Sequence, residues 1–132
     1  MTDSSFFLKN LWRWKCGLPE EDYNKADEPV SLEQIEKEQW SPKFIELMKN
    51  RMIMGWFRYG SIRSQNGQKY KRVEEAIRRL QRYLEEGNDE LLVDVANFCM
   101  IEFEIGVNPN KHFNAVDDGE HCKSNDLCKR NY

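Results

Sequence analysis

Three polar side chains share one narrow face of an otherwise apolar segment, residues 87–106. If the segment is helical, Asp94 and Asn97 fall within about 40° of Glu90 around its axis. An ionised carboxylate in apolar surroundings is costly unless a positive or hydrogen-bonding group meets it. The face is therefore either a metal or ligand site, with Glu90 and Asp94 holding Mg²⁺ and activating water, or a polar seam of a buried helix.

A further pair of carboxylates, Glu74 and Glu75, precedes this segment. Each has an arginine four residues further on, Arg78 and Arg79, which is typical of ion pairs along a helix surface. Glu74 borders an apolar stripe, so we predict that it faces Glu90 and Asp94 across a tight turn as a third metal ligand. Glu75 points away from the stripe and is predicted to have a structural role.

Positive charge is concentrated in the middle of an acidic chain. Between residues 49 and 82 there are ten basic residues and only two acidic ones, although the chain carries a net charge of −3. This asymmetry indicates a small anionic ligand held at one place, or basic side chains that simply solvate two helix faces. Nucleic acid is disfavoured as a partner, because the acidic remainder would repel a long phosphate backbone.

The segment 56–60 ends a predicted helix with aromatic and cationic side chains. Tyr59 is placed to stack on a base, and Arg58 to meet phosphate, although aromatic residues here are also typical of a core. His112 is either a general base or ligand, or a residue whose ring docks over the helices. The candidate ligand-binding residues are Arg58, Tyr59, Lys69, Arg72, Asn97 and His112.

Helical periodicity and capping residues predict an all-α fold, a small bundle of three to five helices with an irregular C-terminal tail. Ser31, Ser41 and either Asn88 or Asp89 are predicted N-caps, and Gly87 is predicted to end a helix. An apolar stripe at Tyr70, Val73, Ile77, Leu80 and Leu84 marks the fourth helix. The predicted helices span residues 6–14, 32–39, 42–60, 69–86 and 89–105. The predicted domains are an arm at 1–40, a helical core at 41–118 and a flexible tail at 119–132.

The sequence has neither a secretory signal nor an apolar run long enough to span a bilayer, which predicts a cytoplasmic protein without a membrane partner. Reduced thiols are then expected for the four cysteines. His121, Cys122 and Cys128 are metal-ligand types at a spacing unlike the usual zinc patterns, which leaves metal binding there open. Trp12 and Trp14 favour self-association into a homo-oligomer.

The order Arg58-Tyr59-Gly60, a helix, and then Leu-Val-Asp-Val-Ala-Asn-Phe at 92–98 resembles a branch of the MazG-like all-α nucleotide pyrophosphohydrolases. In phage and prophage-borne members, a Tyr-Gly helix end precedes an acidic helix with Asp-x-Ala-Asn and an aromatic residue. The stretch 42–118 is also similar to small uncharacterised phage proteins with a Val-Asp-Val-Ala-Asn-Phe…Ile-Glu-Phe…His-Phe pattern.

The resemblance implies that Glu-x-x-Glu on one helix and Glu-x-x-Asp on the next hold Mg²⁺ against a nucleoside triphosphate. Glu90 and Asp94 match the second motif with one additional residue between them. The first motif has no match nearby, because the only Glu-x-x-Glu, at 33–36, lies far upstream. Two hypotheses follow. One is a Mg²⁺-dependent pyrophosphohydrolase-like protein that cleaves the α–β phosphoanhydride of a nucleotide. The alternative is a non-catalytic phage-type protein that sequesters a nucleotide-like signal or binds a host protein.

Overall fold

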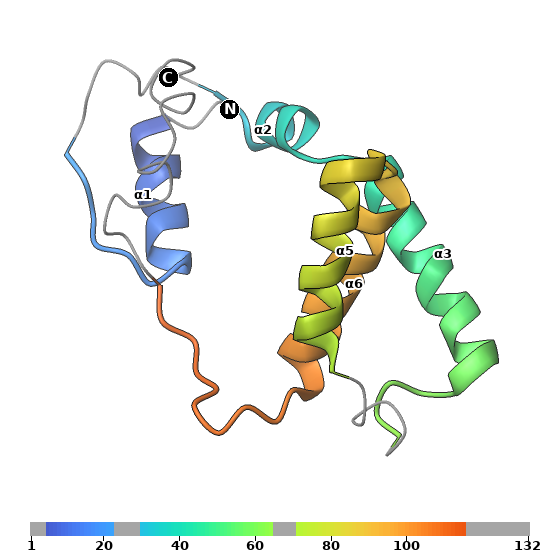
Figure 1. The fold of residues 1–132 in the computed structure, drawn as a ribbon. Coiled ribbons are helices and arrows are strands. Elements are labelled where there is room, and N and C mark those ends of the chain that lie inside the picture. Colours follow the sequence, from blue (N-terminus) through green and yellow to red (C-terminus); the bar gives the residue numbers. More distant parts are fainter. Residues whose placement is uncertain (1–4, 23–29, 65–70, 116–132) are drawn as a thin grey trace. The chain divides into compact units, whose positions relative to one another are not determined.

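The computed structural model describes residues 5–22, 30–64 and 71–115, and these ranges contain helices and no strand (Figure 1). The predicted all-α fold is thereby confirmed. The chain divides into two compact units, one formed by Met1–Trp40 with His112–Tyr132 and the other by Ser41–Lys111. The described helices are α1 (Ser5–Lys15), α2 (Leu32–Gln39), α3 (Pro42–Tyr59), α5 (Arg72–Glu86) and α6 (Asp89–Ile105).

The first unit contains α1 and α2. The residues after α1 fold back along it, because the side-chain amide of Asn10 both donates to and accepts from the backbone of Glu21. Arg13 strengthens this return by hydrogen bonding to the carbonyl of Pro19 at 2.7 Å and pairing with Glu21. The predicted arm therefore has local structure at its start. Ser31 caps α2 as predicted, accepting a hydrogen bond from the backbone N–H of Gln34.

The second unit begins with α3, and its start follows from two adjacent residues. The hydroxyl of Ser41 accepts a hydrogen bond from the backbone N–H of Phe44, and Pro42 occupies the first turn, where its missing N–H costs nothing. The helix ends at Tyr59, and the following Gly60 adopts a positive φ of 81°. Both boundaries agree with the prediction from the sequence.

Replacing Ser41 by alanine is expected to lower the free energy of unfolding of the protein by about 1 kcal/mol, because the first N–H groups of α3 lose their acceptor. Urea denaturation followed by circular dichroism measures this loss. Asparagine at the same position keeps an acceptor, so Ser41→Asn serves as the matched control and should remain near the unaltered protein. Equal losses in both variants would contradict the capping role.

The helices α5 and α6 form an antiparallel hairpin. Gly87 adopts the left-handed conformation, with φ of 66°, and Asn88 caps α6 by accepting from the backbone N–H of Glu90. Both features match the prediction. The start of α5 differs from the predicted start at residue 69, because Lys71 has a non-helical ψ of 75° and the helix begins at Arg72. Lys69 lies outside the described residues.

The core of this unit is small, and its buried apolar residues come from α5 and α6. Ala76, Leu91 and Val93 are its buried apolar side chains among the described residues. The side of α5 that packs against α6 carries Arg72 and Ala76, which are both buried. The apolar stripe of α5 therefore remains largely exposed. No helix in the described part of the chain is long and apolar enough to cross a membrane.

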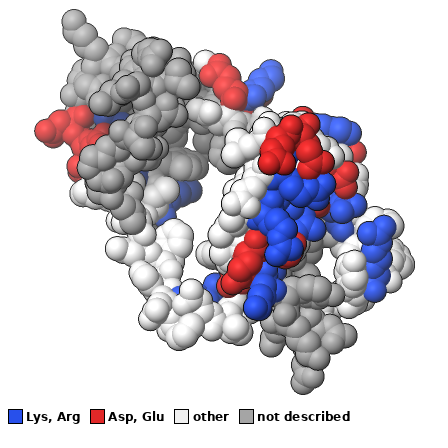
Figure 2. All heavy atoms as spheres, viewed as in Figure 1, with Lys and Arg blue, Asp and Glu red and all other residues white. Residues whose placement is uncertain are grey.

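Basic side chains gather along α5, with acidic side chains above and below them (Figure 2). At its C-terminal end, Arg82 donates hydrogen bonds to Glu86 at 2.7 and 3.3 Å. The hydrogen bond lowers the pKa of the Glu86 carboxyl below its ordinary value and raises that of Arg82. The stabilisation is therefore present above the ordinary pKa of a glutamate and is lost as the pH falls through the lowered pKa.

Candidate functional site

A cavity of about 830 Å³ lies between the C-terminal half of α3 and the α5–α6 pair. The C-terminal end of α3 stands apart from this pair, whereas α5 and α6 run side by side (Figure 1). Five basic and two acidic residues line the cavity, so its wall has an excess of positive charge. The basic residues are Arg51, Arg58, Lys71, Arg72 and Arg79, and the acidic residues are Glu75 and Asp94.

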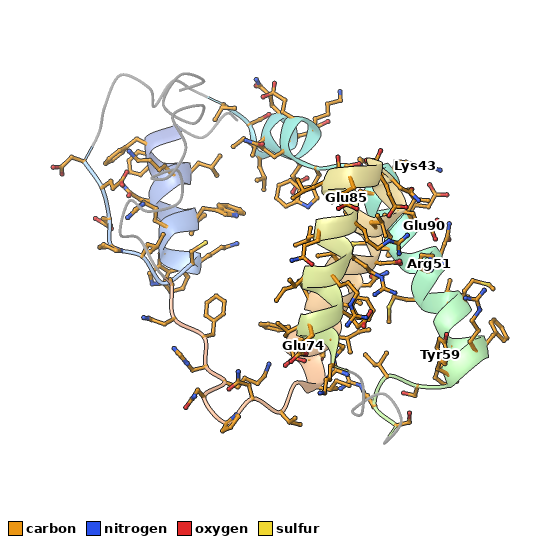
Figure 3. All side chains as sticks on the ribbon, in the orientation of Figure 1. Lys43, Arg51, Tyr59, Glu74, Glu85 and Glu90 are labelled. Atoms are coloured by element: carbon orange, nitrogen blue, oxygen red, sulfur yellow. The ribbon has the colours of Figure 1, made fainter. Side chains whose placement is uncertain are left out.

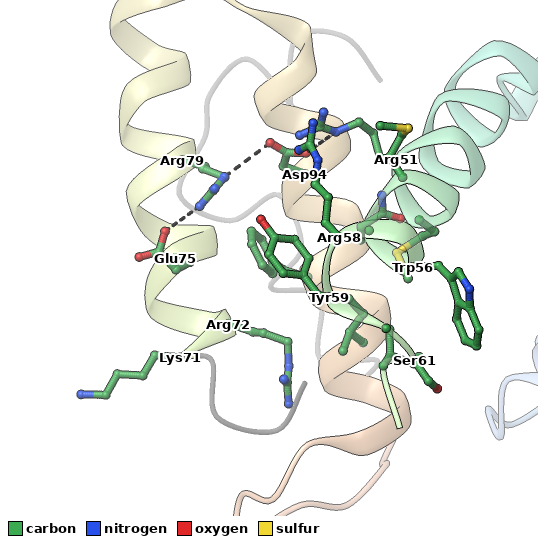
Figure 4. A pocket seen from close by; sticks show the side chains of 18 residues that line it. Arg51, Trp56, Arg58, Tyr59, Ser61, Lys71, Arg72, Glu75, Arg79 and Asp94 are labelled. Atoms are coloured by element: carbon green, nitrogen blue, oxygen red, sulfur yellow. Dashed lines mark hydrogen bonds and ion pairs between the residues drawn. The ribbon is translucent and has the colours of Figure 1, made fainter. Parts of the chain in front are cut away.

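Asp94 lies at the centre of this wall, between arginines from two other helices (Figure 4). Its Oδ1 is 3.3 Å from Nε of Arg51 on α3, and its Oδ2 is 3.5 Å from Nε of Arg79 on α5. The carboxylate is largely buried, with 17% of its side chain exposed. Its burial is therefore offset by two guanidinium groups, which makes the acidic face of α6 a polar seam between three helices.

Glu90 joins the same network one turn earlier. Its Oε1 is 3.2 Å from Nη1 of Arg51, so one guanidinium meets both Glu90 and Asp94 (Figure 3). Glu90 is about half exposed, and solvent weakens this pair more than the pairs of Asp94. The two predicted catalytic carboxylates thus converge on one cation of the chain itself.

Asn97, the third member of the predicted face, is buried. Its Nδ2 donates a hydrogen bond of 3.1 Å to the backbone carbonyl of Met48, which fixes the orientation of the amide and ties α6 to α3. Its Oδ1 has no hydrogen-bond partner among the described residues. Because buried acceptors are usually satisfied, this oxygen is an unusual feature of the cavity wall.

On α5, Glu75 rather than Glu74 contributes to the site. Glu75 lines the cavity and accepts hydrogen bonds of 2.6 Å from both Arg78 and Arg79, the second of which continues to Asp94. Glu74 is exposed and lies near the start of α5 (Figure 3). The sequence predicted the reverse, with Glu74 facing the site and Glu75 pointing away from it. The difference arises because α5 packs on α6 through Arg72 and Ala76 and not through its apolar stripe. This rotation of α5 about its axis directs Glu75, and not Glu74, towards the cavity.

The structure brings several predicted ligand-binding residues together. Arg58, Tyr59, Arg72 and Asn97 all line the cavity. Arg72 is almost fully buried and is 3.3 Å from Glu102 of α6, so part of its charge is already neutralised. His112 belongs to the other unit, and its role stays a prediction. Lys69, His121, Cys122 and Cys128 lie outside the described residues, whereas Cys16 and Cys99 are free thiols.

Three residues of the site were not singled out from the sequence. Arg51 was counted only as part of the basic segment, and Glu75 and Arg79 only as a surface ion pair with a structural role. The spacing of Glu75 and Arg79 did signal a helical ion pair. No local signal identified Arg51, because its partner Asp94 lies 43 residues further along the chain. Cation–π contact of Arg79 with Phe98, at 4.8 Å from the ring centroid, adds to the same cluster.

The predicted metal ligands do not form one group here. Within residues 5–22, 30–64 and 71–115, no cluster of three or more His, Cys, Asp or Glu side chains is arranged to hold a metal ion. Arg51 contacts both Glu90 and Asp94. No family model, curated protein or solved structure matches the chain.

Proposed function

We propose that the cavity between α3 and the α5–α6 pair binds a nucleotide or another phosphorylated small molecule. The charge of the wall carries the proposal: basic residues outnumber acidic ones, and both acidic residues are already paired with arginine. A phosphate group entering the cavity would meet positive charge without meeting an unpaired carboxylate. Charge-assisted hydrogen bonds from guanidinium groups to phosphate are among the stronger polar interactions in proteins.

The shape and the aromatic residues of the cavity support a ligand with a ring. A volume of about 830 Å³ lies within the usual range of small-molecule sites. Tyr59 and Phe98 both line it, and the exposed ring of Tyr59 can stack on a ligand, whereas Arg79 lies over the ring of Phe98. Arg58 makes no hydrogen bond or ion pair with another described residue, so its guanidinium is available to a phosphate. A nucleotide combines these two chemical features.

Binding without turnover is the function that this geometry favours. Each carboxylate oxygen of Asp94 already has an arginine partner, so the residue stabilises the cavity wall as it stands. A protein of this kind would act by sequestering a nucleotide-like signal. This proposal does not require a resident metal ion.

Mg²⁺-dependent hydrolysis is the second candidate. One observation favours it: Glu90 and Asp94 both contact Arg51, so their oxygens converge on a single positive charge. A hard divalent cation prefers such carboxylate oxygens and usually keeps several waters. Mg²⁺ brought in with a nucleotide would have to replace Arg51 between these two residues. Glu90 and Asp94 would then be the metal ligands, and the metal would supply an activated water.

A nucleotide panel tested on the full chain, with and without Mg²⁺, separates the candidates. Thermal shift reports binding, and release of pyrophosphate reports hydrolysis. Thermal stabilisation without pyrophosphate release would support sequestration. Pyrophosphate release that requires Mg²⁺ would support the hydrolase. If no nucleotide stabilises the protein and none is cleaved, both candidates fail.

Replacing Arg58 by glutamine is expected to weaken binding of the best nucleotide by about tenfold, because one unpaired guanidinium is lost from the cavity. Isothermal titration calorimetry measures the dissociation constant. Lys43→Gln removes the same charge from an exposed position of α3 that does not line the cavity, so it is the matched control. Equal weakening in the two variants would show that net charge, and not the cavity, attracts the ligand.

A further inference from the structure

The α5–α6 hairpin carries an apolar face that its own unit leaves uncovered. On α5, the side chains of Val73 and Leu84 are 52% and 85% exposed, and Ile77 and Leu80 between them are also exposed. These four residues are the α5 stripe. Soluble proteins rarely leave a continuous row of large apolar side chains open along a whole helix.

A second row on α6 extends this surface. Leu92, Ala96, Cys99 and Phe103 recur at helical spacing and form the α6 stripe. Phe103 is 63% exposed and Cys99 is also exposed, whereas Leu92 and Ala96 are half-buried. On a helical projection, each stripe lies roughly opposite to the cavity-lining residues of its own helix. The two stripes therefore lie on one side of the hairpin, and the cavity opens on the other side. We call the two stripes together the apolar face.

The spacing within the apolar face is symmetrical. In both stripes successive residues are separated by four, three and four positions, so each reads the same in either direction. The midpoint of the α5 stripe lies between Ile77 and Leu80, and that of the α6 stripe between Ala96 and Cys99. Contacts across the hairpin place these midpoints at one level, because Arg79 lies over the ring of Phe98. One twofold axis can therefore serve both stripes.

We infer that the apolar face binds the same face of a second copy of the chain, as a symmetric antiparallel four-helix dimer. Rotation about that axis places each stripe against the same stripe of the second copy, running in the opposite direction, so Val73 meets Leu84 of the second copy. Spacings of three and four residues are those of interdigitating helix seams. By helix dimensions the face is about 17 Å long and about 20 Å wide, which lies at the small end of the range for protein interfaces.

The small residues in the middle of the α6 stripe fit this arrangement. Ala96 of one copy lies level with Cys99 of the other, where two large side chains would keep the helices apart. Both cavities remain open, because they lie on the outer sides of the dimer. The dimer differs from self-association through Trp12 and Trp14, which belong to the other unit.

Alkylation of the native thiols tests the dimer without altering the protein. The full chain is labelled with iodoacetamide at several protein concentrations, and mass spectrometry measures the rate for each cysteine. We expect labelling of Cys99 to slow by about tenfold or more as the dimer forms, while exposed Cys16 keeps its rate. Slowing at Cys16 alone would overturn the proposal in favour of contact through α1. Constant rates at both positions would overturn it as well.

Light scattering coupled to size-exclusion chromatography then tests which residues hold the copies together. The unaltered chain is expected to have the mass of a dimer, and Ile77→Glu to have that of a monomer with unchanged helical circular dichroism. Phe57→Glu places the same charge on another exposed apolar residue, on α3, and should remain a dimer. A monomeric unaltered chain, or a dimeric Ile77→Glu variant, would refute the interface. If Ile77→Glu loses helical signal, Leu80→Glu, which is also exposed, decides between the same two outcomes.

Discussion

Replacing Asp94 by asparagine is expected to tighten nucleotide binding in the absence of Mg²⁺ by about tenfold, or about 1.4 kcal/mol. Asparagine has nearly the same shape, so the cavity wall is preserved, but the charge that occupies Arg51 and Arg79 is removed. Arg51 then keeps only Glu90 as a carboxylate partner and Arg79 keeps only Glu75, so the N–H groups that faced Asp94 become available to phosphate. With Mg²⁺ present, loss of a metal ligand would instead weaken nucleotide binding. Isothermal titration calorimetry with and without Mg²⁺ measures the change.

The matched control for this substitution is Glu104→Gln. Glu104 lies on the same helix and pairs with Arg63 at 3.1 Å, but it does not line the cavity. The Glu104→Gln substitution should leave the affinity for nucleotide unchanged. If Asp94→Asn instead abolishes a Mg²⁺-dependent release of pyrophosphate, the carboxylate is catalytic, and the hydrolase replaces sequestration as the function. Weaker binding of Asp94→Asn without Mg²⁺ would contradict the role of the arginines as phosphate ligands.

Shortening Leu91 to alanine is expected to lower the free energy of unfolding by about 3 kcal/mol, because the buried side chain leaves a cavity between α5 and α6. Leu91 is only 4% exposed, and it is one of very few buried apolar residues in the described part of this unit. The loss is a large share of the stability of a small domain. Urea denaturation at a fixed protein concentration gives the value.

Leu47→Ala makes the same change at a leucine of α3 that is 37% exposed. We expect it to cost less, about 1 kcal/mol, because a much larger share of the removed surface already contacts water than at Leu91. If both variants lose stability equally, the core between α5 and α6 is not the main source of stability. The stability would then come from the contacts of α3, where Arg51 and Asn97 connect the helices.

The helices could be predicted from the sequence because their ends depend on neighbouring residues. Ser31, Ser41 and Asn88 cap the helices that follow them, and each acts within three residues of its own position. Gly87 ends α5 because it reaches the left-handed conformation without strain. Local chemistry of this kind is read directly from the order of the residues.

The composition of the site was partly predictable, whereas its connections were not. Helical periodicity identified the narrow face of Glu90, Asp94 and Asn97. It also predicted that this face is either a ligand site or a polar seam. The side chains that contact that face depend on how α3 and α5 are rotated about their own axes. Periodicity gives the side of a helix that is apolar, but not the neighbour that the side contacts. For this reason Arg51 was missed as a partner of Asp94.

The rotation of α5 is the clearest example. Its most apolar side was the natural choice for the core, and that choice placed Glu74 at the site. Instead, α6 packs against a side with Arg72 and Ala76, because the small alanine allows close approach and Glu102 neutralises the buried arginine. Glu75 is turned into the cavity as a result. An amphipathic pattern cannot show in advance that a helix will contact its neighbour through a side other than its most apolar one.

The contacts of Asp94 also have a consequence for selectivity. Two of the arginines that we expect to meet phosphate already have an internal carboxylate, so any incoming anion must compete with it. Chloride or a single inorganic phosphate gains little from that exchange, whereas a nucleotide adds stacking and several phosphate contacts at once. The empty cavity would thus reject weak anions that are abundant in a cell. The carboxylate that looked like a catalytic group in the sequence would set the threshold that a ligand must exceed.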